Sequence, residues 1–216
     1  MTDITLWGRT NSANVQKVVW LLEELELPYG HVPLGGSYGG LDDPVYAAMN
    51  PNRKVPTLRD GAVMVWESHA IVRYLAATYA SGLIWPVEPA DRAVVDQWTD
   101  WTATAFQPAW LGLFWTLVRV PETQHDKAEI ERLTRESERL FAIMDDRLAE
   151  VPYLGGSQLT YADIVAGVAM YRWTTMPMER QEHRHVAAWH GRLAERRAFQ
   201  KAVCLPYDEL RGRTDY

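Results

Sequence analysis

The chain has 216 residues, of which 47% are hydrophobic and 23% charged, a balance typical of a globular protein with a substantial core. Its formal net charge of −6 argues against nucleic acid as the main partner, because phosphate binding favours a basic face. No apolar run reaches the roughly 18 residues that a membrane-spanning helix needs. The first five residues show no basic segment before an apolar one, and Cys204, the single cysteine, excludes an internal disulfide. We therefore expect a cytoplasmic protein that binds neither nucleic acid nor membrane.

The N-terminal part alternates strand and helix patterns. The apolar periodicities predict a strand, a helix, a second strand and a short helical turn, at residues 4–7, 14–27, 31–34 and 44–49. Pro28 and Gly30 are expected to end the first helix. The order strand–helix–strand predicts two parallel strands joined by a right-handed crossover.

The most informative stretch follows residue 50. Pro56 suits the entrance of a strand, where its missing N–H costs no ladder hydrogen bond. Asp60 and Gly61 form a two-residue hairpin signal, and Ser68 suits the N-cap of a helix over residues 69–79. The start of a helix offers open backbone N–H groups to an anion. Strand, hairpin and helix together predict a pocket for a small zwitterionic peptide.

The second half of the chain is predicted to be helical. Residues 81–90 are interpreted as a linker, because glycine and proline recur there. Helical periodicity follows over residues 91–118, 126–150, 164–170 and 186–202. A kink is expected at Pro108 in the first of these helices. A capping box between Thr160 and Asp163 precedes the third. The sequence thus predicts an α/β domain over residues 1–80 and an all-helical domain over residues 91–216.

Several motifs occur in a fixed order along the chain, at residues 6–8, 12–18, 50–58, 67–75, 160–163 and 194–199. Together they resemble the cytosolic glutathione S-transferases, and the bacterial theta- and nu-like members most closely. The resemblance covers nearly the whole chain. It implies a thioredoxin-like N-terminal domain (βαβ-ββα), an all-α C-terminal domain, glutathione as co-substrate, no metal, and a two-fold homodimer.

Three polar residues near the start of the first helix are candidates for binding the glutathione sulfur. A thiol with a pKa near ~8.5 is mostly protonated at neutral pH, and lowering that pKa by about two units takes roughly 2.7 kcal/mol. A hydroxyl donor and a helix N-terminus together can supply this stabilisation. By resemblance to theta-like enzymes Ser12 is the first candidate, followed by Asn14 and Asn11; helix capping is the alternative role for Ser12 and Asn14. Trp7 stands where many family members carry tyrosine, so a tyrosine hydroxyl is excluded there.

The resemblance also assigns the residues that bind the rest of glutathione. Ser68 and the helix N-terminus would hold the γ-glutamyl carboxylate, and Glu67 the ammonium group. The backbone of Val55 would pair with the cysteinyl unit, and the bond between Val55 and Pro56 is expected to be cis. Lys54 is a candidate for the glycine carboxylate. The alternative for Ser68 and Glu67 is a purely structural role, as a helix cap beside an exposed acid. The alternative for Lys54 is a solvent-exposed charge in a loop.

The electrophilic second substrate is expected to contact the helical domain. Phe106, Trp110, Phe114 and Trp115 lie near Pro108 and suggest an aromatic wall, although ordinary helix core explains any one of them equally well. The histidines near residue 185 lack acidic or cysteine partners at ligand spacing, so no metal site is expected.

These features leave three functions open. The first is a glutathione transferase, whose bound thiolate attacks a small electrophile in a conjugation or a dehalogenation. The second is a glutathione-dependent disulfide reductase, as in the nu-like branch, which needs no protein cysteine. The third is a non-catalytic glutathione-binding or scaffold protein, because a fold alone does not fix a function.

Overall fold

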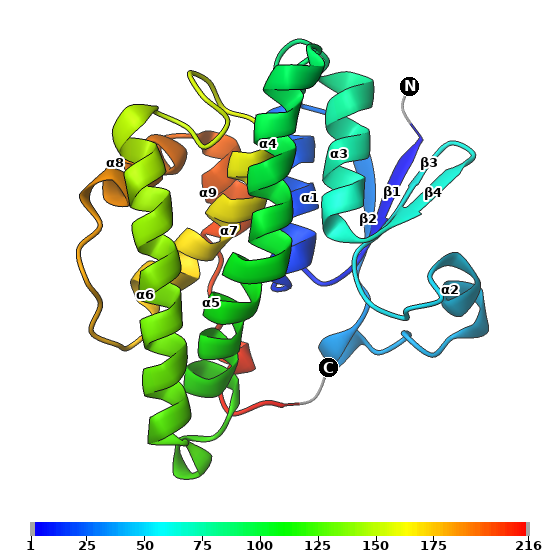
Figure 1. The fold of residues 1–216 in the computed structure, drawn as a ribbon. Helices are drawn as coiled ribbons and strands as arrows, with labels where there is room; N and C mark the ends of the chain where they lie inside the picture. Colours follow the sequence, from blue (N-terminus) through cyan, green and yellow to red (C-terminus); the bar gives the residue numbers. More distant parts are fainter. Residues whose placement is uncertain (1–2, 215–216) are drawn as a thin grey trace.

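A computed structural model describes residues 3–214. The N-terminal part is built on a four-stranded sheet with the strand order β2-β1-β3-β4 (Figure 1). The strands are β1 (Ile4–Trp7), β2 (Tyr29–Val32), β3 (Thr57–Asp60) and β4 (Val63–Trp66). β1 pairs in parallel with β2 and antiparallel with β3, and β3 pairs antiparallel with β4. The predicted parallel pair and the predicted hairpin are therefore confirmed.

Three helices accompany this sheet, namely α1 (Ala13–Glu24), α2 (Pro44–Met49) and α3 (Ser68–Tyr79). α1 and α3 lie between the sheet and the helical domain, whereas α2 lies away from that domain (Figure 1). α1 ends three residues before the predicted boundary, because Glu26 adopts a left-handed φ of 52° and the Leu27 N–H bonds back to the Leu22 carbonyl at 3.0 Å. β2 begins before the predicted strand and includes Gly30, which pairs with Thr5. Pairing with β1 overrides the weak strand propensity of glycine there.

The C-terminal part is helical, as predicted. Its helices are α4 (Pro89–Trp101), α5 (Gln107–Phe114), α6 (Lys127–Glu150), α7 (Tyr161–Thr175), α8 (Arg184–Ala194) and α9 (Arg197–Val203). Among residues 3–214, no helix has the length and apolar character required to cross a bilayer. Figure 1 shows α4 and α5 as one continuous column between α6 and the N-terminal part.

Two predicted helices differ from the structure. The helix expected over residues 91–118 consists of α4 and α5 separated by a π-helical turn, η2 (Thr102–Phe106), and followed by another, η3 (Trp115–Arg119). The wider turn precedes Pro108, which has no N–H for the regular helical ladder. The helix expected over residues 186–202 is broken between α8 and α9, because Arg196 is extended, with φ −79° and ψ 122°.

α7 forms the centre of the molecule and joins the two parts. Nearly all its residues are buried, so this helix has no solvent-exposed stripe. A Cβ added to Gly167 would lie 2.8 Å from both Leu193 and Trp20, and the absence of a side chain at this position lets α7 approach α1 and α8 closely. This packing fixes α1, and with it the loop that precedes α1, against the helical domain.

The predicted capping box at the start of α7 is confirmed. The fully buried Asp163 carboxylate accepts hydrogen bonds from the backbone N–H groups of Thr160 (2.9 Å) and Leu154 (2.8 Å), and from the indole N–H of Trp189 (3.0 Å). One carboxylate therefore holds the helix start, the preceding loop and α8. Its role is structural, in agreement with the interpretation of the sequence.

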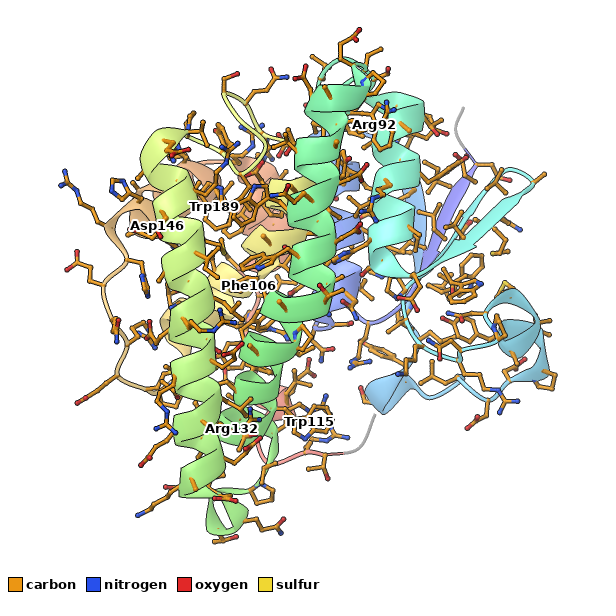
Figure 2. The ribbon with its side chains drawn as sticks, viewed as in Figure 1. Arg92, Phe106, Trp115, Arg132, Asp146 and Trp189 are labelled. Carbon is orange, nitrogen blue, oxygen red and sulfur yellow. The ribbon has the colours of Figure 1, made fainter. Side chains whose placement is uncertain are left out.

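Asp163→Ala should destabilise the protein by at least about 3 kcal/mol, because several buried donors lose their acceptor together. Urea unfolding midpoints of the purified variant measure this loss. Asp146→Ala is the matched control, since Asp146 is exposed on α6 (Figure 2), and its effect should stay within about 0.5 kcal/mol. Equal midpoints for the two variants would contradict the structural role.

Candidate active site

The loop between β1 and α1 carries the first group of predicted residues. Gly8 allows this loop to form, because a Cβ there would lie 2.5 Å from Val15 and 3.2 Å from Val55. Ser12 then takes the N-cap position of α1, but its side chain makes no capping hydrogen bond. Ser12 lines a cavity of about 420 Å³ between the two parts of the molecule. The capping role that the sequence allowed for Ser12 does not occupy this hydroxyl.

Asn14 and Asn11 also line this cavity, with different partners. The Asn14 Oδ1 atom accepts hydrogen bonds from Lys17 Nζ at 3.0 Å and from Gln107 Nε2 at 3.1 Å. These bonds fix the amide and leave its Nδ2 group as a potential donor to a ligand. The Asn11 Nδ2 group already donates to the Glu209 carboxylate. Asn14 is therefore better placed than Asn11 to donate a further hydrogen bond.

A buried lysine beneath this loop is the main residue that sequence analysis missed. Lys17 is fully buried in α1, where its Nζ lies 2.8 Å from His69 Nε2 and 3.4 Å from Ser68 Oγ, and also donates to Gln107. Burial lowers the pKa of Lys17 from 10.5 to about 7, against the opposing effect of the Glu67 carboxylate. A lysine among the mostly apolar buried residues of α1 was the available signal.

His69 completes this buried cluster as a neutral group. Burial, together with the nearby charges of Lys17 and Arg73, lowers the pKa of His69 to about 2. A neutral imidazole nitrogen can accept a hydrogen bond from the lysine amine. The cluster thus links α1, α3 and α5 through polar contacts in the interior.

The start of α3 differs in detail from the prediction. Ser68 is the first residue of the helix, and Glu67 takes the N-cap position with φ 71°, so the prediction of Ser68 as N-cap is wrong. A positive φ is uncommon for a residue with a side chain and concentrates at functional positions. The exposed Glu67 carboxylate accepts a hydrogen bond from Asn52 at 3.3 Å. Ser68 is buried next to Asn14, with 3.4 Å between Oγ and Oδ1.

The segment before β3 has the expected backbone geometry. The peptide bond between Val55 and Pro56 is cis. Two residues that sequence analysis did not single out support this segment, since Tyr46 Oη donates to the Lys54 carbonyl at 2.6 Å and Asn50 Nδ2 donates to the same oxygen at 2.7 Å. Lys54 and Val55 line the cavity, and Pro56 is buried beside them.

The helical domain supplies only half of the predicted aromatic wall. Phe114 and Trp115 line the cavity, and Figure 2 shows Trp115 at the lower end of the α5 column, on the side of the N-terminal part. Phe106 and Trp110 are instead core residues, 0% and 1% exposed. Phe106 packs edge-on against Phe141 of α6 at 5.0 Å between ring centroids. Phe106 thus faces α6, and neither Phe106 nor Trp110 lines the cavity.

Three buried arginines on the cavity wall also escaped the sequence analysis. They are Arg9, Arg119 and Arg172, from the loop after β1, the end of η3 and α7. The cavity therefore combines polar donors from the N-terminal part with aromatic rings and cations at the domain boundary. Such an arrangement can hold a polar peptide beside a second small molecule.

Comparisons with known proteins identify the family. Residues 6–82 match the model of the glutathione S-transferase N-terminal domain, and residues 102–197 match that of the C-terminal domain. The glutathione S-transferase GstB of Escherichia coli is 40% identical over 94% of this chain and 99% of its own length. The chain therefore belongs to the glutathione S-transferase family, as its resemblance indicated.

Two further relatives bear on the fold and the chemistry. A crystal structure of the theta class glutathione S-transferase from Xanthomonas axonopodis pv. citri, with glutathione bound, superposes with a TM-score of 0.91. It is 47% identical to this chain, and the alignment covers 95% of this chain and 99% of that one. The disulfide-bond oxidoreductase YfcG of Escherichia coli is 29% identical over 88% of this chain and 90% of its own length.

Lys17→Met should change how stability depends on pH. Between about pH 7 and pH 10.5 the unfolded chain keeps the Lys17 proton that the folded protein has lost, so the contribution of Lys17 to stability rises with pH in this window. The unfolding free energy of wild type minus that of the variant should therefore increase by up to about 1.4 kcal/mol for each pH unit.

Urea unfolding of both proteins across this window measures the difference. Lys127→Met, at an exposed position of α6, is the control and should give a difference that does not depend on pH. A pH-independent difference for Lys17→Met would contradict the assigned shift.

Proposed function

We propose that this chain binds glutathione at the junction of its two parts and transfers it, as a thiolate, to a small electrophile. The observation that supports this most strongly is the Ser12 hydroxyl, which is free of a capping bond and lines the same cavity as Val55 and Trp115. The thiolate would lie at the N-terminus of α1, where the Ser12 hydroxyl and the helix dipole both stabilise negative charge.

Glutathione binding is supported by the groups around this position. The first N–H groups of α3 and the Ser68 hydroxyl suit the γ-glutamyl carboxylate, and the exposed Glu67 carboxylate suits the ammonium group. The Val55 backbone before the cis bond suits pairing with the cysteinyl unit, and Lys54 suits the glycine carboxylate. The similar Xanthomonas enzyme was solved with glutathione bound.

In the proposed reaction the thiol proton leaves to solvent, and the thiolate forms a C–S bond with the electrophilic carbon. The leaving group, a halide for example, departs with the electron pair of the broken bond. Asn14 Nδ2 offers a second donor to the sulfur, held in place by the contacts of its Oδ1 with Lys17 and Gln107. The electrophile would lie in the part of the cavity lined by Leu111 and Trp115.

A glutathione-dependent disulfide reductase is the second candidate, supported by the similarity to the YfcG oxidoreductase. One glutathione thiolate would attack the disulfide to form a mixed disulfide, and a second would release oxidised glutathione and the remaining thiol. No protein cysteine is required. Burial raises the pKa of Cys204, which lies after α9 and does not line the cavity. Reduction of 2-hydroxyethyl disulfide without conjugation of any aryl or alkyl halide would favour this reaction.

Ser12→Ala should lower kcat/KM for conjugation of 1-chloro-2,4-dinitrobenzene by about 100- to 1,000-fold, the usual effect of removing one donor from a developing anion. Ser12→Thr keeps a hydroxyl and should retain most of the activity. Ser81→Ala, in the exposed connection between the two parts, serves as the matched control and should match wild type. Full activity in Ser12→Ala together with loss of activity in Asn14→Ala would instead assign stabilisation of the thiolate to Asn14.

We also propose that the protein is a homodimer. β4 is an edge strand of the sheet and exposes Val63, Met64 and Trp66, which are 43%, 38% and 38% accessible. An exposed apolar edge is usually covered by a partner. Light scattering coupled to size-exclusion chromatography should give twice the 24.7 kDa of one chain. Trp66→Lys should shift the protein to the monomer, and a monomeric wild type would contradict the proposal.

A further inference from the structure

The Lys17 amine lies directly behind the proposed glutathione site. Its Nζ atom is 3.0 Å from Asn14 Oδ1, beside the proposed sulfur position, and 3.4 Å from Ser68 Oγ, beside the proposed γ-glutamyl position. A carboxylate that accepts the Ser68 O–H at about 2.7 Å has its oxygen within about 6 Å of this amine. A single polar side chain therefore separates Lys17 from each negative group that the ligand would bring.

The atoms around this amine are hydrogen-bond acceptors without a full charge. Nζ contacts oxygen atoms of Asn14, Ser68 and Gln107, and the Nε2 atom of His69. An ammonium group has three N–H donors, so these neighbours can accept hydrogen bonds from all of them. None of the four side chains is a carboxylate, however, and a buried ammonium group without a counterion is unfavourable. The geometry thus suits a charged lysine once a negative charge arrives nearby.

The charged groups on the neighbouring helix α3 do not supply this counterion. Burial lowers the pKa of His69 to about 2, so its imidazole is neutral. Arg73 is a cation and pairs with Asp96 and Asp100 of α4. The Glu67 carboxylate raises the pKa of the lysine, but its exposure to solvent screens that effect. α3 therefore gives the charged form of the amine only weak electrostatic support.

The other helices packed against α1 hold their charged groups in contacts of their own. Two ion pairs join the end of α1 to the region of α9, namely Glu24 with Arg196 and Glu23 with Lys201. In α7, Asp163 accepts from the start of its own helix, and Arg172 donates to the Asn11 carbonyl. α5 contributes the uncharged Gln107. Burial therefore dominates and lowers the pKa of the amine to about 7.

A bound γ-glutamyl group changes this balance. An opposite charge within about 4–6 Å typically shifts a pKa by about 1–3 units toward the charged form. The carboxylate on Ser68 would lie within that range, on the buried side of the ligand. The ammonium group of the ligand would lie beside Glu67, on the exposed side, where solvent screens its repulsion. The ligand thus brings the counterion that the neighbours of the amine do not supply.

We propose that Lys17 takes up a proton when glutathione binds, so that its ammonium group balances the γ-glutamyl carboxylate on Ser68 and, through Asn14, the thiolate. This rests on the proposed glutathione site. The proton comes from solvent, adds to the lone pair of the amine, and returns to solvent when the product leaves, so turnover consumes none. Lys17 does not touch the reacting atoms and acts as a positioning residue.

S-Methylglutathione has no ionisable thiol, so its binding isolates this proton. Calorimetric titrations in buffers of different ionisation enthalpy give the number of protons taken up for each ligand bound. In wild type the uptake should be close to zero at about pH 6, where Lys17 is already charged, and should reach about half a proton or more between about pH 7 and pH 8.5. The dissociation constant should rise at least about fivefold across the same range.

Three variants assign the proton to its residue. Lys17→Met should abolish the uptake, whereas Lys127→Met, at an exposed position of α6, should keep it. Lys17→Arg keeps a permanent positive charge and should bind S-methylglutathione without uptake and without the loss of affinity at high pH. Uptake that persists unchanged in Lys17→Met or in Lys17→Arg would assign the proton to another group and overturn the proposal.

A matched pair of ligands needs no variant. S-Methylated glutaryl-cysteinylglycine keeps the carboxylate of the γ-glutamyl group and lacks its ammonium group, and the S-methylated 4-aminobutyryl peptide has the reverse. Wild type should take up a proton with the first ligand and none with the second. Equal uptake with both would overturn the role of the carboxylate, and with it the proposal.

The outcomes separate this inference from the proposed function. Binding of S-methylglutathione to wild type without proton uptake at any pH would overturn the role of Lys17 alone. Failure of wild type to bind both glutathione and S-methylglutathione would overturn the glutathione site, and the inference with it.

Discussion

The site depends on one buried amine. Lys17 Nζ contacts Asn14 and His69 from the N-terminal part and Gln107 from α5 of the helical domain. Taking an ammonium group out of water costs several kcal/mol, so a lysine can be buried here only because polar partners surround its amine. Those partners are the residues next to the proposed sulfur and γ-glutamyl positions. The hydrogen bonds that Lys17 makes in the interior thus fix the orientation of Asn14 and Ser68. They also couple the two parts of the protein, because Gln107 belongs to the helical domain.

The same boundary between the parts has two electrostatic environments. On the Lys17 side, the side chains of Lys17, Asn14 and Gln107 form hydrogen bonds with one another. On the cavity side, Arg9, Arg119 and Arg172 line a space that is open to a ligand. A thiolate at Ser12 would lie between the two, at the start of α1, which favours negative charge. The proposed thiolate therefore lies where these two environments meet.

Local sequence patterns predicted the features that depend on local interactions. The strand and hairpin signals around Asp60 and Gly61, and the capping box at Thr160, are set by residues close together in the chain, and the structure has them. The assignment of Ser68 as N-cap was wrong by one residue, because Glu67 adopts a positive φ that its residue type does not suggest. Phe106 and Trp110 could not be separated from Phe114 and Trp115, since helical periodicity alone does not say which face meets α6.

The residues that sequence analysis missed depend on contacts between distant parts of the chain. Lys17 meets His69 and Gln107, which follow it by 52 and 90 residues. Arg172 lies in a nearly apolar helix, and a cation in such a run is a signal that could be sought in other sequences. Its partner, the Asn11 carbonyl, is 161 residues away. Buried charges of this kind are placed by the tertiary fold, so their role emerges only when the cavity is seen.

The central claim is that the protein stabilises the glutathione thiolate at Ser12. A titration of the enzyme–glutathione complex, following thiolate absorbance against pH in wild type and Ser12→Ala, tests it most directly. The account predicts a bound thiol pKa about two units below the free value of roughly 8.5 in wild type, and a return toward that value in Ser12→Ala. Glutathione that binds to wild type with an unshifted thiol pKa would contradict it.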